Sequence, residues 1–352
     1  MQNNAPEQQP DAEQVSLKGK AFALPTLVSF AFAAFFILFL LTRFDIDLSA
    51  TWDEVRTAHA GWFLLALFTY YATFPLRGLR WRLLLHNAEV IEKKAKPQPR
   101  VRELGLFVLI SFFANSVSFF RLGDAFRGYL LTDKWKVSFP KTIGTILAER
   151  ILDVGVVFFL LLIASIGVLR GETSATAEKI IIAAGAVAVL VSLVLIAMRI
   201  YGTKVTRFLP AKARPFYERF QVSTLMSFRN LPPLILLTAA IWLMEAGRLY
   251  FVVQSLDFEV GLALILFAAL ANSMLTTIPL TPGGLGLVEL GLTGLLAITL
   301  DRSNAAGVTL LDRSISYFSL VIFGGLAFAI RQAVEMRMRK RAPATPVSQR
   351  RS

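Results

Sequence analysis

The chain has no cysteine and only two histidines, His59 and His86, among its 352 residues. Without thiols it can form no disulfide bond and offers no thiolate as a nucleophile or a metal ligand. With two histidines, a histidine metal site is not expected either. The chain also lacks the G-x-x-x-x-G-K-[ST] motif of nucleotide-binding loops. We therefore expect no metal, no cofactor and no nucleotide-driven step.

Long polar stretches are also scarce, because 55% of the residues are hydrophobic and the mean hydropathy is +0.59. Apolar segments of roughly 17–25 residues recur, and a helix of that length crosses the ~30 Å hydrocarbon core of a bilayer. The composition predicts an all-α polytopic membrane protein with a single transmembrane domain over 22–331. The candidate segments are 22–42, 61–80, 104–120, 142–168, 179–198, 232–253, 261–278, 287–300 and 309–330.

Two polar ends flank this domain. Residues 1–21 lack the basic start and the short apolar core of a cleaved signal peptide, so we expect a disordered cytoplasmic N-terminus and a first apolar segment that stays in the membrane. Residues 332–352 are expected to form a basic cytoplasmic tail that contacts anionic lipid.

The net charge of +13 is distributed in a way that favours a membrane partner over nucleic acid. Of the 37 lysines and arginines, 29 fall in the N-terminal flank and in regions 77–103, 121–141, 199–229 and 331–352. The positive-inside bias of membrane proteins explains this pattern if all five regions are cytoplasmic. We therefore expect a multi-pass protein of the cell (inner) membrane with both termini cytoplasmic and no nucleic-acid partner. The oligomeric state stays open.

Segment 104–120 lies between two basic regions, so it does not cross the membrane if both are cytoplasmic. We interpret 104–132 as a re-entrant hairpin that enters from the cytoplasm and returns. The same argument makes 261–300 a hairpin that opens from outside, with TPGGLG (281–286) at its tip. About six full spans and two opposed hairpins then satisfy every loop. The alternatives are eight or nine simple spans, with TPGGLG as a tight turn between two of them.

An ordered correspondence between the two halves predicts an internal repeat. Units 61–168 and 232–330 each consist of a span, a hairpin and a span, and they begin on opposite sides of the membrane. Inverted repeats with broken helices are typical of transporters, whose substrate site lies near the bilayer midplane. The matched positions are Arg77 and Arg80 with Glu245 and Arg248, Ala114-Asn115-Ser116 with Ala271-Asn272-Ser273, Leu122-Gly123-Asp124 with Leu287-Val288-Glu289, and Glu149-Arg150 with Asp312-Arg313.

Charged residues within the apolar segments are the main functional candidates. Each costs ~2.5–3.5 kcal/mol to insert at mid-membrane, so acids and arginines are expected to pair. The pairs fit two interpretations, salt bridges that hold helices together and a polar path for a charged group. The candidate substrate-binding positions are Arg77, Arg80, Asn115, Arg121, Asp124, Arg127, Glu149, Arg150, Asp153, Glu245, Arg248, Asn272, Pro282, Gly283, Gly284, Gly286, Glu289, Asp312 and Arg313.

Glu289 follows the helix breakers of TPGGLG and falls in the first turn of the returning helix. The positive end of a helix dipole attracts anions, whereas a bare carboxylate repels a lipid phosphate. We therefore expect Glu289 to pair with an arginine of the opposite repeat, or to take up a proton or a cation during transport.

Four motifs, in order, resemble the flippase-like membrane domain of bacterial lysyl-phosphatidylglycerol synthases. They are RLGDAFRGYLL (121–131), TILAERILDVGVV (145–157), IPLTPGGLGLVELGL (278–292) and TLLDRSISYFSLVIFGG (309–325), and the resemblance spans about 25–331. It implies a stand-alone membrane domain that moves or handles a lipid between leaflets. Related domains are associated with aminoacylated phosphatidylglycerol or with polyprenyl-phosphate-linked sugars. The soluble aminoacyl-transfer domain is missing from this sequence, so synthase activity is not expected.

Three functions are compatible with these features. The first is a flippase-like transporter that moves an anionic or modified phospholipid, or a polyprenyl-phosphate-linked lipid, between leaflets. The second is an integral membrane glycosyl- or phosphotransferase that uses acids of an outer loop, Asp45, Asp47, Asp53 and Glu54. The third is a scaffold for an envelope-lipid enzyme. We expect the first function, and therefore no enzyme activity.

Overall fold

The computed structural model describes residues 56–91, 98–118, 121–169, 175–277 and 281–341, and the predicted span 22–42 lies outside them. Within the described residues every regular element is a helix, which confirms the prediction of an all-α protein. The helices are α4 (Ala60–Asn87), α5 (Val101–Val117), α6 (Leu122–Trp135), α7 (Phe139–Leu169), α8 (Ala175–Val205), α9 (Arg214–Met226), α10 (Leu231–Ser255), α11 (Leu262–Thr277), α12 (Leu287–Leu296), α13 (Arg302–Arg313) and α14 (Leu320–Arg341).

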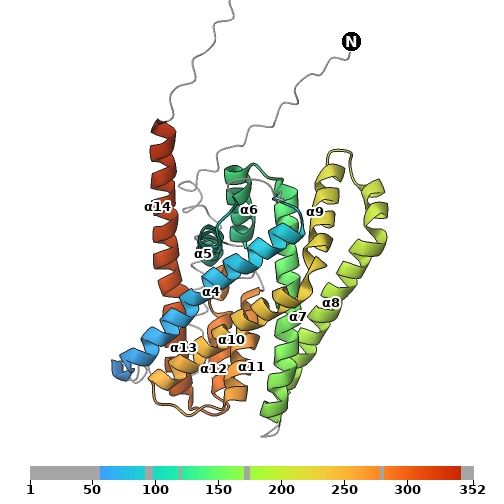
Figure 1. Cartoon of the computed structure of the whole chain (residues 1–352). Coiled ribbons are helices and arrows are strands. Elements are labelled where there is room, and N and C mark those ends of the chain that lie inside the picture. The colour runs from blue at the N-terminus through green and yellow to red at the C-terminus, as the bar shows by residue number, and fades with distance from the viewer. Residues whose placement is uncertain (1–55, 92–97, 119–120, 170–174, 278–280, 342–352) are drawn as a thin grey trace, which may run out of the picture.

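Helices α4 and α10 pack against each other as an antiparallel pair and run diagonally through the molecule (Figure 1). At one end the backbone N–H of His59 donates to the carbonyl of Ser255 at 2.7 Å. At the other end the Asn87 side chain donates to the carbonyl of Ser227 at 3.0 Å. The first helix of each predicted repeat unit therefore runs opposite to its counterpart.

Two pairs of short helices lie on either side of this central pair. Helices α5 and α6 pack together as the first helix pair, and α11 and α12 pack together as the second. Helix α11 has 16 residues and α12 has 10, fewer than the ~20 that a straight span needs. The first pair contacts α14 of the second unit, while the second pair contacts α7 of the first unit. That each pair enters and leaves on one side of the membrane stays a prediction.

The two turns meet inside the molecule. We call residues 116–118 together with Arg121 the first tip, and residues 281–286 the second tip. The hydroxyl of Tyr317 donates to the carbonyl of Ser116 at 3.4 Å, and a Cβ added to Gly283 would lie 2.6 Å from the Tyr317 ring. Gly283 also has φ +60°, a conformation that glycine adopts readily. Glycine at 283 therefore lets the second tip approach Tyr317.

Two helices lie where no apolar segment was predicted. Helix α6 includes much of the basic region 121–141, and α9 lies within the basic region 199–229. Helix α9 packs on α7 through buried hydroxyls, since Ser223 donates to the carbonyl of Lys141 at 2.5 Å and Thr224 donates to that of Gly144 at 3.2 Å. Such a polar contact leaves no hydropathy signal, which is why α9 was missed.

The last predicted span, 309–330, is part of a longer helical stretch. Helix α13 continues through a π-helical segment, Ser314–Ser319, into α14, which ends at Arg341, within the predicted tail 332–352. In the described part of the chain, three stretches are long and apolar enough to cross a membrane by themselves: Ile181–Gly202, Leu231–Ser255 and Arg302–Glu335.

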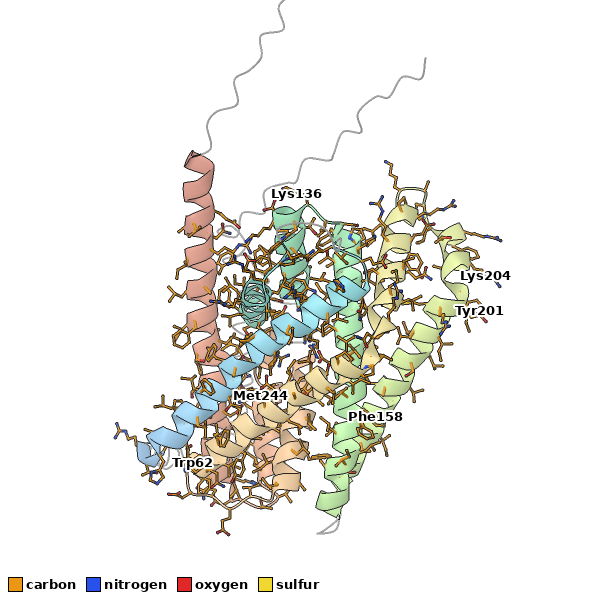
Figure 2. The ribbon with its side chains drawn as sticks, in the orientation of Figure 1. Trp62, Lys136, Phe158, Tyr201, Lys204 and Met244 are labelled. Atoms are coloured by element: carbon orange, nitrogen blue, oxygen red, sulfur yellow. The ribbon has the colours of Figure 1, made fainter. Side chains whose placement is uncertain are left out.

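Labelled lysines of two basic regions lie in the same half of the molecule. Figure 2 shows Lys136, which follows α6, and Lys204, near the end of α8, in one half, and Trp62 in the opposite half. Helix α14 ends toward the same side of the molecule as α6 (Figure 1). This arrangement is the one that cytoplasmic basic regions require, while the orientation in the cell stays a prediction.

The crossing of α4 and α5 yields a first prediction. A Cβ on Gly78 would lie 2.6 Å from both the Gly105 nitrogen and the Val101 carbonyl, which are backbone atoms that cannot move aside. We expect Gly78→Ala to lower the free energy of unfolding by about 1–3 kcal/mol. The thermal midpoint of the purified protein in detergent measures this loss.

Gly155→Ala is the matched control, because a Cβ on this glycine of α7 has nothing within 4 Å. Alanine favours a helix more than glycine does, so the control should be as stable as wild type or slightly more stable. Equal midpoints for the two variants would contradict close packing at this crossing.

Candidate functional site

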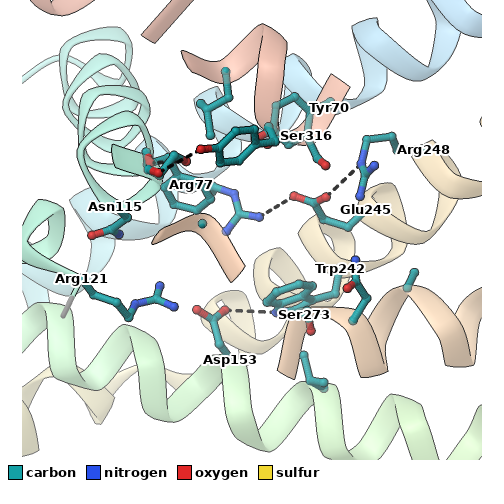
Figure 3. Close-up of a pocket in the computed structure, with 18 of the residues that line it drawn as sticks. Tyr70, Arg77, Asn115, Arg121, Asp153, Trp242, Glu245, Arg248, Ser273 and Ser316 are labelled. Carbon is teal, nitrogen blue, oxygen red and sulfur yellow. Dashed lines mark hydrogen bonds and ion pairs between the residues drawn. The ribbon is translucent and has the colours of Figure 1, made fainter. Parts of the chain in front are cut away.

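A cavity of about 190 Å³ lies where the two tips meet α4, α7 and α10 (Figure 3). Its walls combine charged, amide and hydroxyl groups with aromatic rings. The lining residues are Tyr70, Arg77, Phe112, Asn115, Ser116, Ser118, Arg121, Arg150, Asp153, Val154, Val157, Trp242, Glu245, Arg248, Ala269, Asn272, Ser273, Thr281, Gly283, Arg313, Ser316, Tyr317 and Leu320. The volume is sufficient for several water molecules or for a phosphate-sized group.

One wall of the cavity is a chain of ion pairs across the central helices. Arg77 of α4 donates to Glu245 of α10 at 2.8 Å. Arg248, one turn further along α10, donates to the other oxygen of Glu245 at 3.3 Å and also to Asp312 of α13. Glu245 is therefore held between two guanidinium groups at the cavity surface, as Figure 3 shows.

A second group of charges lies behind the cavity, between α4, α6 and α7. Arg80 donates to Glu149 at 2.8 Å and to Asp153 at 2.6 Å. Arg127 contacts the other oxygen of Glu149 at 3.0 Å. The side chains of Arg80, Arg127 and Glu149 are fully buried. Because a buried charge without a partner is very costly, these contacts hold the three helices together.

Each helix pair carries an acid in the first turn of its second helix. Asp124 of α6 accepts from Arg150 of α7 at 3.4 Å, and Glu289 of α12 accepts from Arg313 at 2.6 Å. Arg313 also donates to the carbonyl of Gly283 at 3.1 Å. The second tip is therefore fastened by one arginine that binds both its acid and its backbone.

The predicted partner for Glu289, an arginine of the opposite repeat, is wrong. Arg313 belongs to the same unit, 232–330, because α12 returns directly beside α13. Glu289 also accepts the backbone N–H of Gly286 at 2.6 Å and so caps its own helix. Uptake of a proton or a cation by Glu289 stays a prediction.

The ion pairs of the two units correspond. In each unit an arginine of the first helix (α4 or α10) binds an acid of the helix that follows the helix pair (α7 or α13). The residue after that acid is an arginine, which binds the acid at the start of the pair's second helix. The contacts are Arg80–Glu149 and Arg150–Asp124 in the first unit, and Arg248–Asp312 and Arg313–Glu289 in the second. This correspondence supports the predicted repeat, and Arg77–Glu245 joins the two units.

Comparison with known families identifies the membrane domain. The model of the lysylphosphatidylglycerol synthase transmembrane region matches residues 26–324. The chain belongs to this family. It is a multi-pass membrane protein, and the family resemblance of its four motifs is confirmed.

Of three curated relatives of this family member, two are named UPF0104 membrane protein and one is named a glycosyltransferase. A UPF0104 membrane protein of Methanocaldococcus jannaschii is 34% identical over 225 residues, which are 62% of this chain and 94% of the relative. A UPF0104 membrane protein of Pyrococcus horikoshii is 25% identical, over 75% of this chain and 85% of the relative. Glycosyltransferase AglD of Haloferax volcanii is 22% identical, over 93% of this chain and 59% of AglD.

The 19 positions predicted for the substrate site of this family member separate into two sets. Ten line the cavity: Arg77, Asn115, Arg121, Arg150, Asp153, Glu245, Arg248, Asn272, Gly283 and Arg313. Eight do not, namely Arg80, Asp124, Arg127, Glu149, Gly284, Gly286, Glu289 and Asp312, and the side chain of Pro282 lies outside the described part of the structure. The charged members of this second set bind charged members of the first or one another, so they hold the lining arginines and acids in place.

Several lining residues were missed because their types are ordinary in apolar helices. Tyr70 lies two turns before Arg77 on α4, with its ring 5.6 Å from the Arg248 guanidinium, and Trp242 lies one turn before Glu245 on α10. Their helical spacing from the charged residues could have identified them. Tyr317 lies 4.8 Å from the Arg313 guanidinium, at the same one-turn spacing.

The buried charges yield a second prediction. Arg80→Gln would remove one of the two close partners of the fully buried Glu149 and the shortest ion-pair contact of Asp153. We expect the free energy of unfolding to fall by about 3–5 kcal/mol, measured as a lower thermal midpoint in detergent.

Arg229→Gln is the control, because the ion pair of Arg229 with Glu89 is more than half exposed, at 62% and 59% of the two side chains. Solvent-exposed pairs contribute about 0–1 kcal/mol, so this variant should remain close to wild type. A similar decrease of the thermal midpoint in the two variants would show that the burial of the Arg80 ion pairs does not matter for stability.

Proposed function

We propose that this protein is a flippase-like transporter that moves a lipid with an anionic headgroup between the leaflets of the cell membrane. The substrate is an anionic or modified phospholipid or a polyprenyl-phosphate-linked lipid. The headgroup passes through the charged cavity while the acyl or prenyl chains stay in the bilayer. Both termini of the protein lie in the cytoplasm.

The observation that carries this proposal is the charge of the cavity wall. Among the described residues, five arginines line the cavity (Arg77, Arg121, Arg150, Arg248 and Arg313), against two acids, Asp153 and Glu245. Guanidinium groups bind phosphate through two parallel hydrogen bonds and remain charged at any physiological pH. An excess of arginine in the cavity lining therefore favours a phosphate-bearing ligand.

The position of the cavity between two broken helix pairs also supports transport. Irregular backbone at membrane depth is tolerated where it is buried in protein or lines a wet cavity. The first and second tips both contribute lining residues, Ser118 and Arg121 from one, Thr281 and Gly283 from the other. A shift of either tip would change access to the cavity, which is the requirement for alternating access.

Family membership agrees with a lipid substrate, and the sequence has no nucleotide-binding motif to supply energy. The proposed transport therefore runs down the lipid gradient or is driven by an ion gradient. The printed name of AglD favours one other candidate, a glycosyltransferase. The acids predicted for that activity, Asp45, Asp47, Asp53 and Glu54, lie outside the described residues. We propose that the chain is no enzyme.

Transport through the cavity gives a third prediction. In proteoliposomes that contain a fluorescent phosphatidylglycerol, wild type should speed translocation above that of empty vesicles. Arg150→Ala and Glu289→Gln should each slow it about tenfold, because the first removes a lining charge and the second loosens the second tip. Loss of fluorescence to a membrane-impermeant quencher measures the rate.

Arg82→Gln is the control, since Arg82 lies on the exposed face of α4 and should leave the rate unchanged. Wild-type rates in both cavity variants would remove the cavity from the lipid path. Sugar or phosphate transfer from a lipid-linked donor by the purified chain would instead establish an enzyme.

A further inference from the structure

The two helix pairs have different residues at one corresponding position, the one just before the second helix of each pair. Helix α6 begins after Arg121, and helix α12 begins after Gly286. Both residues have positive φ, +52° at Arg121 and +86° at Gly286, and both precede an acid by three residues. The chain therefore enters both returning helices through a residue of positive φ, glycine at one position and arginine at the other, although ψ differs between them, +41° at Arg121 and −52° at Gly286.

Glycine is the residue that this backbone conformation favours, because a Cβ crowds the following carbonyl when φ is positive. Arg121 keeps the unfavourable conformation although the corresponding position of the second unit has the favourable residue. Three other described residues that are not glycine, Glu89, Lys136 and Asp257, also have positive φ, so Arg121 is distinguished by where its side chain lies. The side chain of Arg121 projects into the cavity, as Figure 3 shows.

The charged residues that form ion pairs at and behind the cavity are also divided unequally between the two units. The first unit contributes five arginines (Arg77, Arg80, Arg121, Arg127 and Arg150) and three acids (Asp124, Glu149 and Asp153). The second unit contributes two arginines (Arg248 and Arg313) and three acids (Glu245, Glu289 and Asp312). The positive excess therefore comes from the first unit.

Two arginines of the first unit, Arg121 and Arg127, have no arginine at the matched position, which holds Gly286 and Leu292. Arg127 is fully buried between Glu149 and the ring of Trp81, away from the cavity. Arg121 lines the cavity, and its contact with Asp124 at 3.5 Å is shared, because Arg127 and Arg150 also contact that acid. Arg127 and Arg150 also contact Glu149, and Arg150 contacts Asp153. Together with Arg80, four guanidinium groups surround these three carboxylates, and the excess of one positive charge favours a further anion.

We propose that Arg121 binds the phosphate of the headgroup, and that the phosphate subsite lies at the first tip and not at the second. The second tip serves as a fixed support, since its arginine, Arg313, binds Glu289 and the Gly283 carbonyl. This inference rests on the proposed function and makes the binding site asymmetric within a repeated scaffold.

The test is equilibrium binding of dioctanoyl phosphatidylglycerol and, separately, of inorganic phosphate to the purified full chain in detergent, measured by calorimetry. Wild type should bind the lipid, and weaker binding of inorganic phosphate would show that the glycerol or acyl groups add affinity. Arg121→Gly and Arg121→Asn should each weaken lipid binding about tenfold or more, with thermal midpoints at or above that of wild type. Both replacements tolerate positive φ, so a folded protein is expected.

Lys136→Gly is the matched control, because Lys136 ends the same helix with φ +51° but is exposed and outside the cavity. It relieves the same backbone conformation and should leave affinity unchanged. Wild-type affinity in Arg121→Asn would overturn the proposal, and so would a lower thermal midpoint in both Arg121 variants, since Arg121 would then be kept for stability.

The proposed function and this inference fail in different ways. If the Arg121 variants bind and translocate lipid as well as wild type does, the proposed function is supported and the assignment of the phosphate subsite to Arg121 is wrong. If wild type neither binds nor translocates lipid, both the proposed function and the subsite assignment are wrong.

Discussion

Charge burial is the constraint on which the rest of this structure depends. A charged side chain away from water persists only with a partner, and among the described residues seven arginines and six acids form three groups of ion pairs at and behind the cavity. The helices lie where these pairs can form: Arg80 brings α7 to α4, and Arg77 brings α10 to α4. Because desolvation offsets much of the attraction, these ion pairs determine the arrangement of helices more than their net stability.

The broken helices impose the same requirement on the backbone, whose polar groups also need partners. At the first tip the Asn115 side chain accepts the N–H of Gly123 at 2.9 Å. At the second tip Glu289 accepts the N–H of Gly286, and Arg313 donates to the carbonyl of Gly283. The side chains that surround the cavity therefore also stabilise its irregular walls, so tips and cavity form one unit.

The two repeat units have corresponding helices and ion pairs, but they differ in net charge. Corresponding ion pairs hold corresponding helices, whereas the excess of arginine falls in the first unit. A symmetric scaffold explains how two tips can meet at one cavity. The unequal charge explains how such a cavity can prefer an anion on one of its sides, because potential follows the sum of the charges and not the symmetry of the backbone.

The amino-acid sequence by itself determined the apolar helices, because apolar length needs no knowledge of neighbours: within the described residues each predicted segment has its helix. It also indicated which residues carry charge into the membrane. Only the tertiary structure decided the partners, since Arg77 and Glu245 lie 168 residues apart and Glu289 binds whichever arginine packs beside α12. Packing contacts place Tyr70 in the cavity and stabilise α9 as a helix, and such contacts leave no pattern in a single stretch of the sequence.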